Sequence, residues 1–274
     1  MLQVMLCSFV RHVARSRALL GYGVFLAVTT QGCKSKPVAS KAPVQQNAPV
    51  SLKPLQAATL QVNLDLRDAP AAELLIPRGI TKPSPVVLVL GENATDLTSS
   101  CAKWGKMVGE GHFVLCQCAP SEDLQVDARA DAAERALRAA LRVTKRRFGA
   151  YVSAENVTLV GVDIMGTVVA AMMRKSPAFF SRVALLEQGF AQWTAVDSAR
   201  FATIPTANAL LMCSSQQCEL EATRVAVTLR ASGVKATLLL NTASAEGKPA
   251  LAQVDAPEFR AALAQLLAAP KSAP

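Results

Sequence analysis

Few side chains in this chain could serve as a general base near neutral pH, and one carboxylate stands at a position suited to chemistry. Among 274 residues there are two histidines, His12 and His112. Any imidazole-based catalysis must use one of them, because histidine alone has an ordinary pKa near neutrality. Asp163 lies in Gly161-Val-Asp-Ile-Met-Gly166, between an apolar run and a stretch of small and apolar residues. At a sharp turn between a strand and a helix, such a carboxylate either acts as a nucleophile or caps the helix.

Three further carboxylates, Glu92, Glu187 and Glu246, follow predicted strands. Two carboxylates can share acid and base work when their surroundings separate their pKa values. For Glu92 and Glu246 the alternative is that they are solvated loop side chains. Two histidines exclude a metal site built from several imidazoles, and the cysteine spacing does not support a zinc site. We therefore expect neither a metal ion nor another cofactor.

The basic surplus of the chain is confined to its N-terminus. The net charge is +9, from 29 Lys and Arg against 20 Asp and Glu. Residues 1–54 hold seven basic side chains and no acidic one, so residues 55–274 carry a net charge of only +2. A globular part this close to neutrality lacks the basic surface that binds nucleic acid, so nucleic acid is not an expected partner.

Residues 1–32 have the order of features of a secretory signal peptide. Three arginines precede an apolar run, residues 18–28, which is too short to span a membrane comfortably. Gly32-Cys33 follows, and it resembles the lipobox of bacterial lipoproteins, in which the cysteine is acylated and becomes the new N-terminus. The resemblance implies that Cys33 is lipidated. Ordinary cleavage near Thr30, with Cys33 as a free or paired thiol, is the alternative.

Residues 33–54 have the composition of a disordered tether. They are rich in Lys, Pro, Ser, Ala and Gln and show no apolar period. Diacylation at Cys33 supplies enough hydrocarbon for stable membrane anchoring. Lys34 after the cysteine resembles an outer-membrane sorting signal. We therefore expect a lipid-anchored protein of the bacterial cell envelope, in the outer membrane and facing the periplasm or the cell surface.

Five cysteines follow the predicted lipidation site, and an exported protein can join them in disulfides. Cys213 and Cys218 have a workable spacing for a bridge that closes a loop. Cys101 is expected to pair with either Cys116 or Cys118, because residues two apart on a strand share one face. Buried, inert thiols are the alternative for all five.

Residues 55–270 alternate between short apolar runs and helical patterns, which predicts one domain. Two short strands are expected at residues 60–66, an exposed edge, and 73–77. Strands buried on both faces are expected at residues 86–90, 113–116, 157–160, 183–186, 209–212 and 236–240. Helices are expected at residues 128–147, 219–232 and 257–267. This alternation favours a doubly wound, mostly parallel eight-stranded α/β sheet with helices on both faces.

The run of residues 155–173 resembles the nucleophile elbow of the α/β-hydrolase fold, particularly that of dienelactone hydrolases and esterases. In those proteins a strand ending in Gly-x-Ser-x-Gly turns sharply into a helix of small residues. Residues 85–91 are similar to the strand before the oxyanion loop, and residues 104–115 to the helix and strand that follow it. The order of elements agrees over roughly residues 58–268. The resemblance implies an α/β-hydrolase fold with its site at the carboxyl edge of the sheet.

The resemblance also implies a catalytic triad, and this sequence departs from it at every member. Asp163 takes the nucleophile position, as in haloalkane dehalogenases, and Met165 replaces the second glycine, which predicts a relaxed or shifted turn. The acid position falls in residues 214–217, which hold no carboxylate, and Glu246 stands where the histidine belongs. His112 precedes its strand, at the edge of the sheet opposite to the expected site.

Two functions from different classes remain. The first is a membrane-anchored lipoprotein whose hydrolase-like domain is non-catalytic and binds a small molecule or an envelope protein. Phe190 and Trp193 either line its pocket or pack in the core. The alternative is an atypical hydrolase of esters or carbon–halide bonds, with Asp163 as nucleophile and Glu246 as base. We favour the first, because a carboxylate is a far weaker base than imidazole unless burial raises its pKa.

Overall fold

A computed structural model of the chain describes residues 52–57, 60–66, 70–91, 97–240 and 256–268. The predicted signal peptide and Cys33 lie outside these residues, as do Glu92 and Glu246. No helix in the described ranges is long and apolar enough to cross a membrane.

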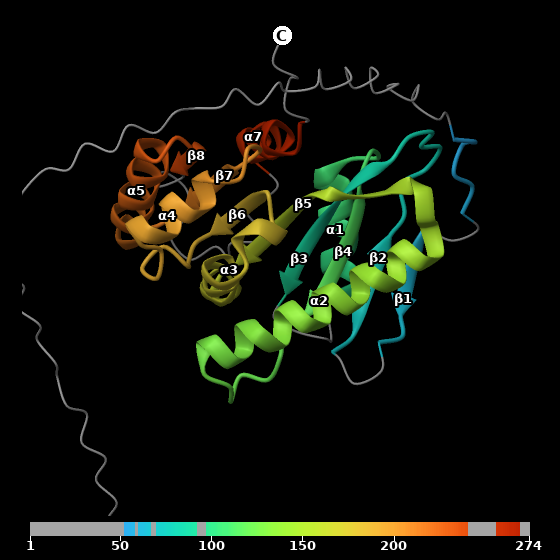
Figure 1. Ribbon diagram of the computed structural model, residues 1–274, viewed down its shortest axis with the longest axis horizontal. Coiled ribbons are helices and arrows are strands. Elements are labelled where there is room, and N and C mark those ends of the chain that lie inside the picture. Colours follow the sequence, from blue (N-terminus) through green and yellow to red (C-terminus); the bar gives the residue numbers. More distant parts are fainter. Residues whose placement is uncertain (1–51, 58–59, 67–69, 92–96, 241–255, 269–274) are drawn as a thin grey trace, which may run out of the picture. The chain divides into compact units, whose positions relative to one another are not determined.

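Eight strands form one sheet in the order β1-β2-β4-β3-β5-β6-β7-β8 (Figure 1). The two edge pairings, β1 with β2 and β2 with β4, are antiparallel, and the strands from β4 through β3 to β8 are all parallel. The strands are β1 (Gln61–Leu64), β2 (Ala72–Leu75), β3 (Ser84–Gly91), β4 (Phe113–Cys118), β5 (Val152–Val162), β6 (Arg182–Leu186), β7 (Asn208–Cys213) and β8 (Lys235–Leu240). This confirms the predicted fold class.

The parallel strands lie where the sequence has unbroken apolar runs. Every residue of β4 and of β6 is buried, because helices cover both faces of the sheet at these strands. β1 lies at the edge of the sheet and is only partly buried, as its alternating pattern predicts.

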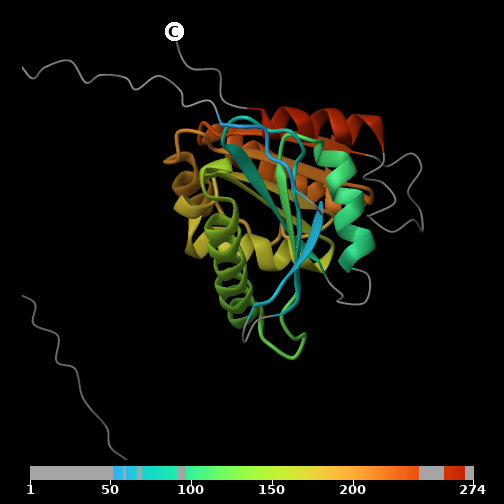
Figure 2. The same cartoon turned by 90° about the vertical axis from the view of Figure 1, so that its right-hand side faces the viewer.

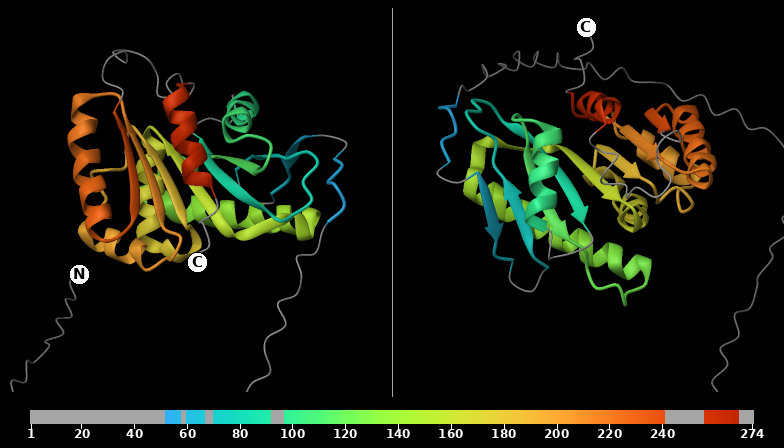
Figure 3. Two further views of the ribbon diagram at one scale, coloured as in Figure 1. Left: turned by 90° about the horizontal axis from the view of Figure 1, so that it is seen from above. Right: turned by 180° about the vertical axis from the view of Figure 1, so that it is seen from behind.

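Helices cover the sheet in two layers. The helices are α1 (Leu97–Val108), α2 (Val126–Phe148), α3 (Ile164–Lys175), α4 (Ala195–Ala202), α5 (Gln216–Ala231) and α7 (Pro257–Leu267), with short 3-10 turns η2 (Gly149–Tyr151) and η3 (Pro177–Phe179). α1 and α7 share one apolar core with one face of the sheet, and α2, α3 and α5 share the other core. Figures 2 and 3 show α1 and α7 on the side of the sheet away from α2.

Helix α4 falls in a stretch that the sequence pattern assigns to a connection after β6. Its start has a complete capping box, in which the Thr194 hydroxyl accepts from the Asp197 N–H and the Asp197 carboxylate accepts from the Thr194 N–H. The Thr-x-x-Asp spacing at 194–197 is a helix-start signal that could have revealed α4 from the sequence.

The folded part of the chain begins before residue 55. The Leu52 N–H donates to the Thr81 carbonyl and the Leu55 N–H donates to the Ile80 carbonyl. The Tyr151 hydroxyl donates to the Lys53 carbonyl. Residues 52–54, which the sequence pattern assigns to a tether, therefore lie against the domain.

Two disulfides join elements of this domain. Cys101 on α1 pairs with Cys116 on β4, and Cys213 pairs with Cys218 across the turn between β7 and α5. Cys118 is a free thiol and is buried. From the loop lengths, chain-entropy estimates give about 3 kcal/mol of stabilisation for the first bridge and about 2 kcal/mol for the second. The first bridge fixes α1 to the sheet, and the second fixes the end of β7.

Candidate functional site

Asp163 occupies a sharp turn between β5 and α3. Its backbone has a conformation that residues other than glycine rarely adopt. Its φ is 50° and its ψ is −134°. Such a conformation costs of order 1–3 kcal/mol and persists only when the surroundings hold it. Two backbone hydrogen bonds do so: the Asp163 N–H donates to the Leu186 carbonyl at 3.0 Å, and the Gly166 N–H donates to the Asp163 carbonyl at 2.8 Å.

Glycines let the backbones meet around this turn. A Cβ on Gly161 would lie 2.9 Å from the Gly166 Cα and 2.7 Å from the Val169 Cγ2. A Cβ on Gly166 would collide with the Gln188 carbonyl. Gly166 therefore supplies the close approach that the sequence analysis assigned to position 165.

The turn is not relaxed, which corrects one of the two outcomes expected from Met165. Met165 is completely buried and belongs to the core shared by α2, α3 and α5. The close backbone contact is made one residue later, at Gly166, so the turn keeps its strained form without a glycine at 165.

The Asp163 side chain does not cap α3, so the capping hypothesis is wrong as well. Asp163 is the N-cap residue, but its carboxylate accepts no capping hydrogen bond. Burial raises the pKa of the Asp163 carboxyl, and the nearby charge of Glu187 raises it further. The charge of Glu187 therefore disfavours the ionisation of Asp163.

Glu187 follows β6 and links the carboxyl ends of three strands. It is the second non-glycine residue with positive φ, at 69°. Its N–H donates to the Met212 carbonyl at 2.9 Å, and its Oε2 accepts from the Ser214 N–H at 3.1 Å. Its Oε1 is buried and accepts no hydrogen bond from the described residues. The sequence marked Glu187 as one of several carboxylates but gave no sign of this contact.

Ser214 stands at the position where the family resemblance expects the catalytic acid, so a carboxylate from β6 reaches the end of β7. The Cys213–Cys218 disulfide encloses Ser214 in a short loop, and the Ser215 hydroxyl accepts from the Cys218 N–H to cap α5. This closed loop holds the Ser214 N–H toward Glu187. Three neighbouring strand ends thus present one carboxyl pair, Asp163 and Glu187.

His112 lies at the opposite edge of the sheet. It precedes the first residue of β4, whereas Asp163 follows the last residue of β5, and both strands are parallel to β3. Burial lowers the pKa of His112, and the charge of Arg182 lowers it further. His112 is therefore a neutral imidazole that does not serve as the base for Asp163.

The two aromatic residues after β6 belong to the core. Phe190 and Trp193 are buried, and the Trp193 Nε1–H donates to the Ser198 hydroxyl at 2.9 Å. The Arg224 guanidinium donates to both of their carbonyls. They pack in the core and anchor the loop that carries Glu187. In the part of the chain that the structure describes, no group of three His, Cys, Asp or Glu side chains is placed to hold a metal ion.

The glycine contacts give a first prediction. Gly161→Ala and Gly166→Ala should each lower the free energy of unfolding by about 1–3 kcal/mol, because the new Cβ meets packed backbone atoms. Gly111→Ala, whose Cβ meets nothing within 4 Å, is the matched control and should change it by less than about 0.5 kcal/mol. Urea denaturation measures all three; an equal effect at the three positions would contradict the packing described here.

The carboxyl pair gives a second prediction. A folded-state pKa above the unfolded one makes the ionised Asp163 unfavourable, so stability present below about pH 4 is lost as the pH rises through the folded pKa. Asp163→Asn removes this loss, and asparagine tolerates positive φ. The variant should melt above the wild type at pH 7, with the difference shrinking toward pH 3. Exposed Asp65→Asn is the control, and a difference independent of pH would contradict the account.

Comparisons with known proteins bear on the fold. No protein-family model and no curated protein matches the chain. A thermostable esterase matches with 15% identity and a TM-score of 0.53, over 75% of this chain and 63% of that chain. Carboxyl esterase 2 of the mycorrhizal fungus Tuber melanosporum matches with 12% identity and a TM-score of 0.53, over 78% and 89%.

A third solved structure is much longer than this chain. Acylaminoacyl peptidase of Pyrococcus horikoshii matches with 12% identity and a TM-score of 0.53, over 81% of this chain and 43% of that chain. The chain thus spans less than two thirds of this peptidase and of the thermostable esterase. At these identities the likeness concerns the backbone arrangement, and together with the strand order it shows that the chain has an α/β-hydrolase-like fold.

Proposed function

We propose that this protein is an exported lipoprotein, anchored to the membrane of the cell envelope through Cys33, whose α/β-hydrolase-like domain binds its target without turning it over. One observation carries the second half of the proposal. The chain keeps the strained turn that presents Asp163, yet its two histidines are His12, in the predicted signal peptide, and His112, at the far edge of the sheet. We therefore infer that neither histidine acts as a general base at this turn.

The surroundings of the carboxyl pair support a binding role. The charge of Glu187 acts on Asp163, and the Glu187 carboxylate accepts from the Ser214 backbone N–H, a contact that fixes its position. The raised pKa of Asp163 favours its protonated form, which offers a hydrogen-bond donor to a bound molecule. The Glu187 Oε1, which has no hydrogen-bond partner among the described residues, offers an acceptor.

A second candidate function is hydrolysis with Asp163 as nucleophile. The strained backbone and the raised pKa of Asp163 favour it, because both are features of reactive residues. The similar solved structures that carry the name esterase also fit it. In this scheme the ionised Asp163 attacks carbon and displaces halide to form an ester, or displaces the alkoxide of an acyl ester, which leaves as the alcohol after protonation, to form an anhydride. A second carboxylate takes a proton from the water that then hydrolyses this intermediate and restores Asp163.

An activity assay separates the two functions. The purified full chain and its Asp163→Asn variant are compared on short acyl esters and on haloalkanes. Our proposal predicts no turnover above the rate without protein for either substrate class and no difference between the two chains. Turnover that Asp163→Asn abolishes would overturn it in favour of the hydrolase.

The anchor is tested separately. Cys33→Ser should move the protein from the membrane fraction to the soluble fraction, because the serine hydroxyl is not acylated in place of the thiol. Cys7→Ser, in the predicted signal peptide, is the matched control and should leave the protein with the membrane. Fractionation and immunoblotting measure both; a Cys33→Ser protein that stays membrane-bound would refute lipidation at this residue.

A further inference from the structure

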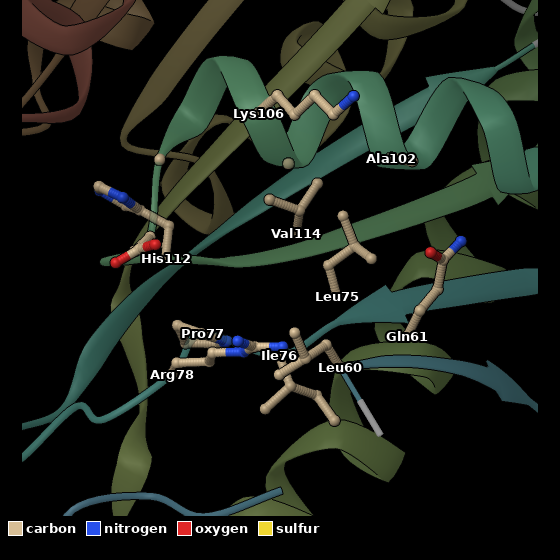
Figure 4. Close-up of a pocket in the computed structure, with 13 residues that line it drawn as sticks. Leu60, Gln61, Leu75, Ile76, Pro77, Arg78, Ala102, Lys106, His112 and Val114 are labelled. Carbon is tan, nitrogen blue, oxygen red and sulfur yellow. The ribbon is translucent and has the colours of Figure 1, made fainter. Parts of the chain in front are cut away.

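A cavity of about 500 Å³ lies between α1 and the edge strands β1 and β2, away from the Asp163 turn. Its size is in the range of small-molecule sites. Apolar side chains on or next to three strands line it: Leu60 just before β1, Leu75 and Ile76 at the end of β2, and Val114 on β4. Figure 4 shows them beneath α1, whose Ala102 closes the wall from above.

Two glycines of this region leave the cavity open. On α1, Gly105 has no side chain, and the Leu75 Cδ1 occupies the place that a Cβ would take there, so α1 lies close to β2 at this position. At the end of α1, Gly109 adopts a φ of 82°, and a Cβ there would meet nothing within 4 Å. The space beside Gly109 is therefore part of the opening.

Two cations flank the apolar interior. Lys106 stands on α1 and Arg78 follows β2, and in Figure 4 they lie on opposite sides of Leu75 and Val114. Both side chains are exposed at the opening, and neither has a salt bridge among the described residues. Glu110 is the single carboxylate in the lining. The positive charges are free to meet an anion.

The remaining polar groups of the lining limit the chemical class of ligand that the cavity can bind. The Gln61 Nε2 already donates to the Glu73 carboxylate at 2.6 Å and to the Thr98 carbonyl at 3.2 Å, so it has no donor left for an anion. His112 is a lining residue whose Nδ1 is buried and has no hydrogen-bond partner within the described ranges. Burial and Arg182 keep the imidazole neutral by lowering its pKa. The cavity therefore offers cations at the mouth and apolar contact within.

We propose that this cavity binds a small amphiphilic anion, a carboxylate with an unbranched alkyl chain, with the carboxylate between Arg78 and Lys106 and the chain against Leu75 and Val114. An alkyl chain matches the apolar walls. A single negative charge on the ligand balances the net positive charge that Arg78, Lys106 and Glu110 give the lining. The site is at the amino edge of the parallel strands, so it does not depend on whether Asp163 binds or reacts.

Octanoate below its micellar concentration is the probe. The full chain carrying Cys33→Ser is used, so that no detergent competes, and isothermal titration calorimetry measures the dissociation constant. We expect saturable binding of one octanoate. Arg78→Gln and Lys106→Gln should each weaken it about five- to tenfold, because each loses a charge-assisted contact at an exposed mouth. Lys103→Gln, exposed on the same helix and outside the lining, is the matched control and should bind as the parent does.

Two further arms test the alkyl chain and the charge separately. Ala102→Phe should fill the cavity and abolish binding while the melting temperature stays within a few degrees; if it fails to fold, the charge variants still decide the outcome. 1-Octanol should bind more weakly than octanoate, and octyltrimethylammonium should not compete. Absence of saturable octanoate binding, equal binding of octanoate and octanol, or an equal loss in Lys103→Gln would each overturn the proposal. Failure here leaves the activity assay on Asp163 unaffected.

Discussion

The close approach of backbones at the end of β5 determines where α3 lies and how Asp163 is presented. Gly161, Gly166 and Gly189 meet there, and a Cβ on Gly189 would collide with the Gly166 carbonyl just as one on Gly166 would collide with Gln188. α3 can therefore start directly against the ends of β5 and β6. The backbone strain at Asp163 and Glu187 follows from this geometry, because both residues lie in turns that leave the sheet between the glycine contacts.

The same geometry explains why the chemistry at this turn differs from that of a serine hydrolase. Asp163 lies at the carboxyl edge of the sheet. The charged group that acts on it there is a second carboxylate, Glu187, and not an imidazole. The disulfide between Cys213 and Cys218 encloses Ser214, whose N–H binds Glu187. Burial and the charge of Glu187 raise the pKa of Asp163 there, and we interpret this turn as a binding surface. The cavity under α1 lies at the other edge of the sheet, where we propose a second binding site.

Most of the fold could be predicted from the sequence, because each buried strand is an unbroken apolar run with a helix after it. The strands 182–186 and 208–213 match the predicted runs closely, and the helix 257–267 was predicted at its observed bounds. α4 was not predicted, because it is short and its start is marked only by one capping box at 194–197. The consequence of Met165 was predicted wrongly, because the pattern of letters does not reveal that the neighbouring Gly166 makes the backbone contact.

The site itself was predictable only in part. Asp163 follows from the position of the turn. Its electrostatic interaction with Glu187 depends on how β5 and β6 lie side by side, and the hydrogen bond between Glu187 and the Ser214 N–H depends on β7 as well. The cavity depends on α1 packing across β2, which places Arg78 and Lys106 around one opening although they are far apart in the sequence. Such tertiary contacts leave no local pattern in the amino-acid sequence.

The central claim is that burial and the charge of Glu187 together hold the pKa of Asp163 above its ordinary value. Carbon-13 NMR of the Asp163 carboxyl, followed through a pH titration of the wild type and of Glu187→Gln, tests it most directly. We predict that Asp163 titrates above the ordinary range of aspartate in the wild type and that its pKa falls in Glu187→Gln, where burial alone still raises it. An Asp163 that titrates in the ordinary range, or whose pKa is the same in both proteins, would contradict the claim.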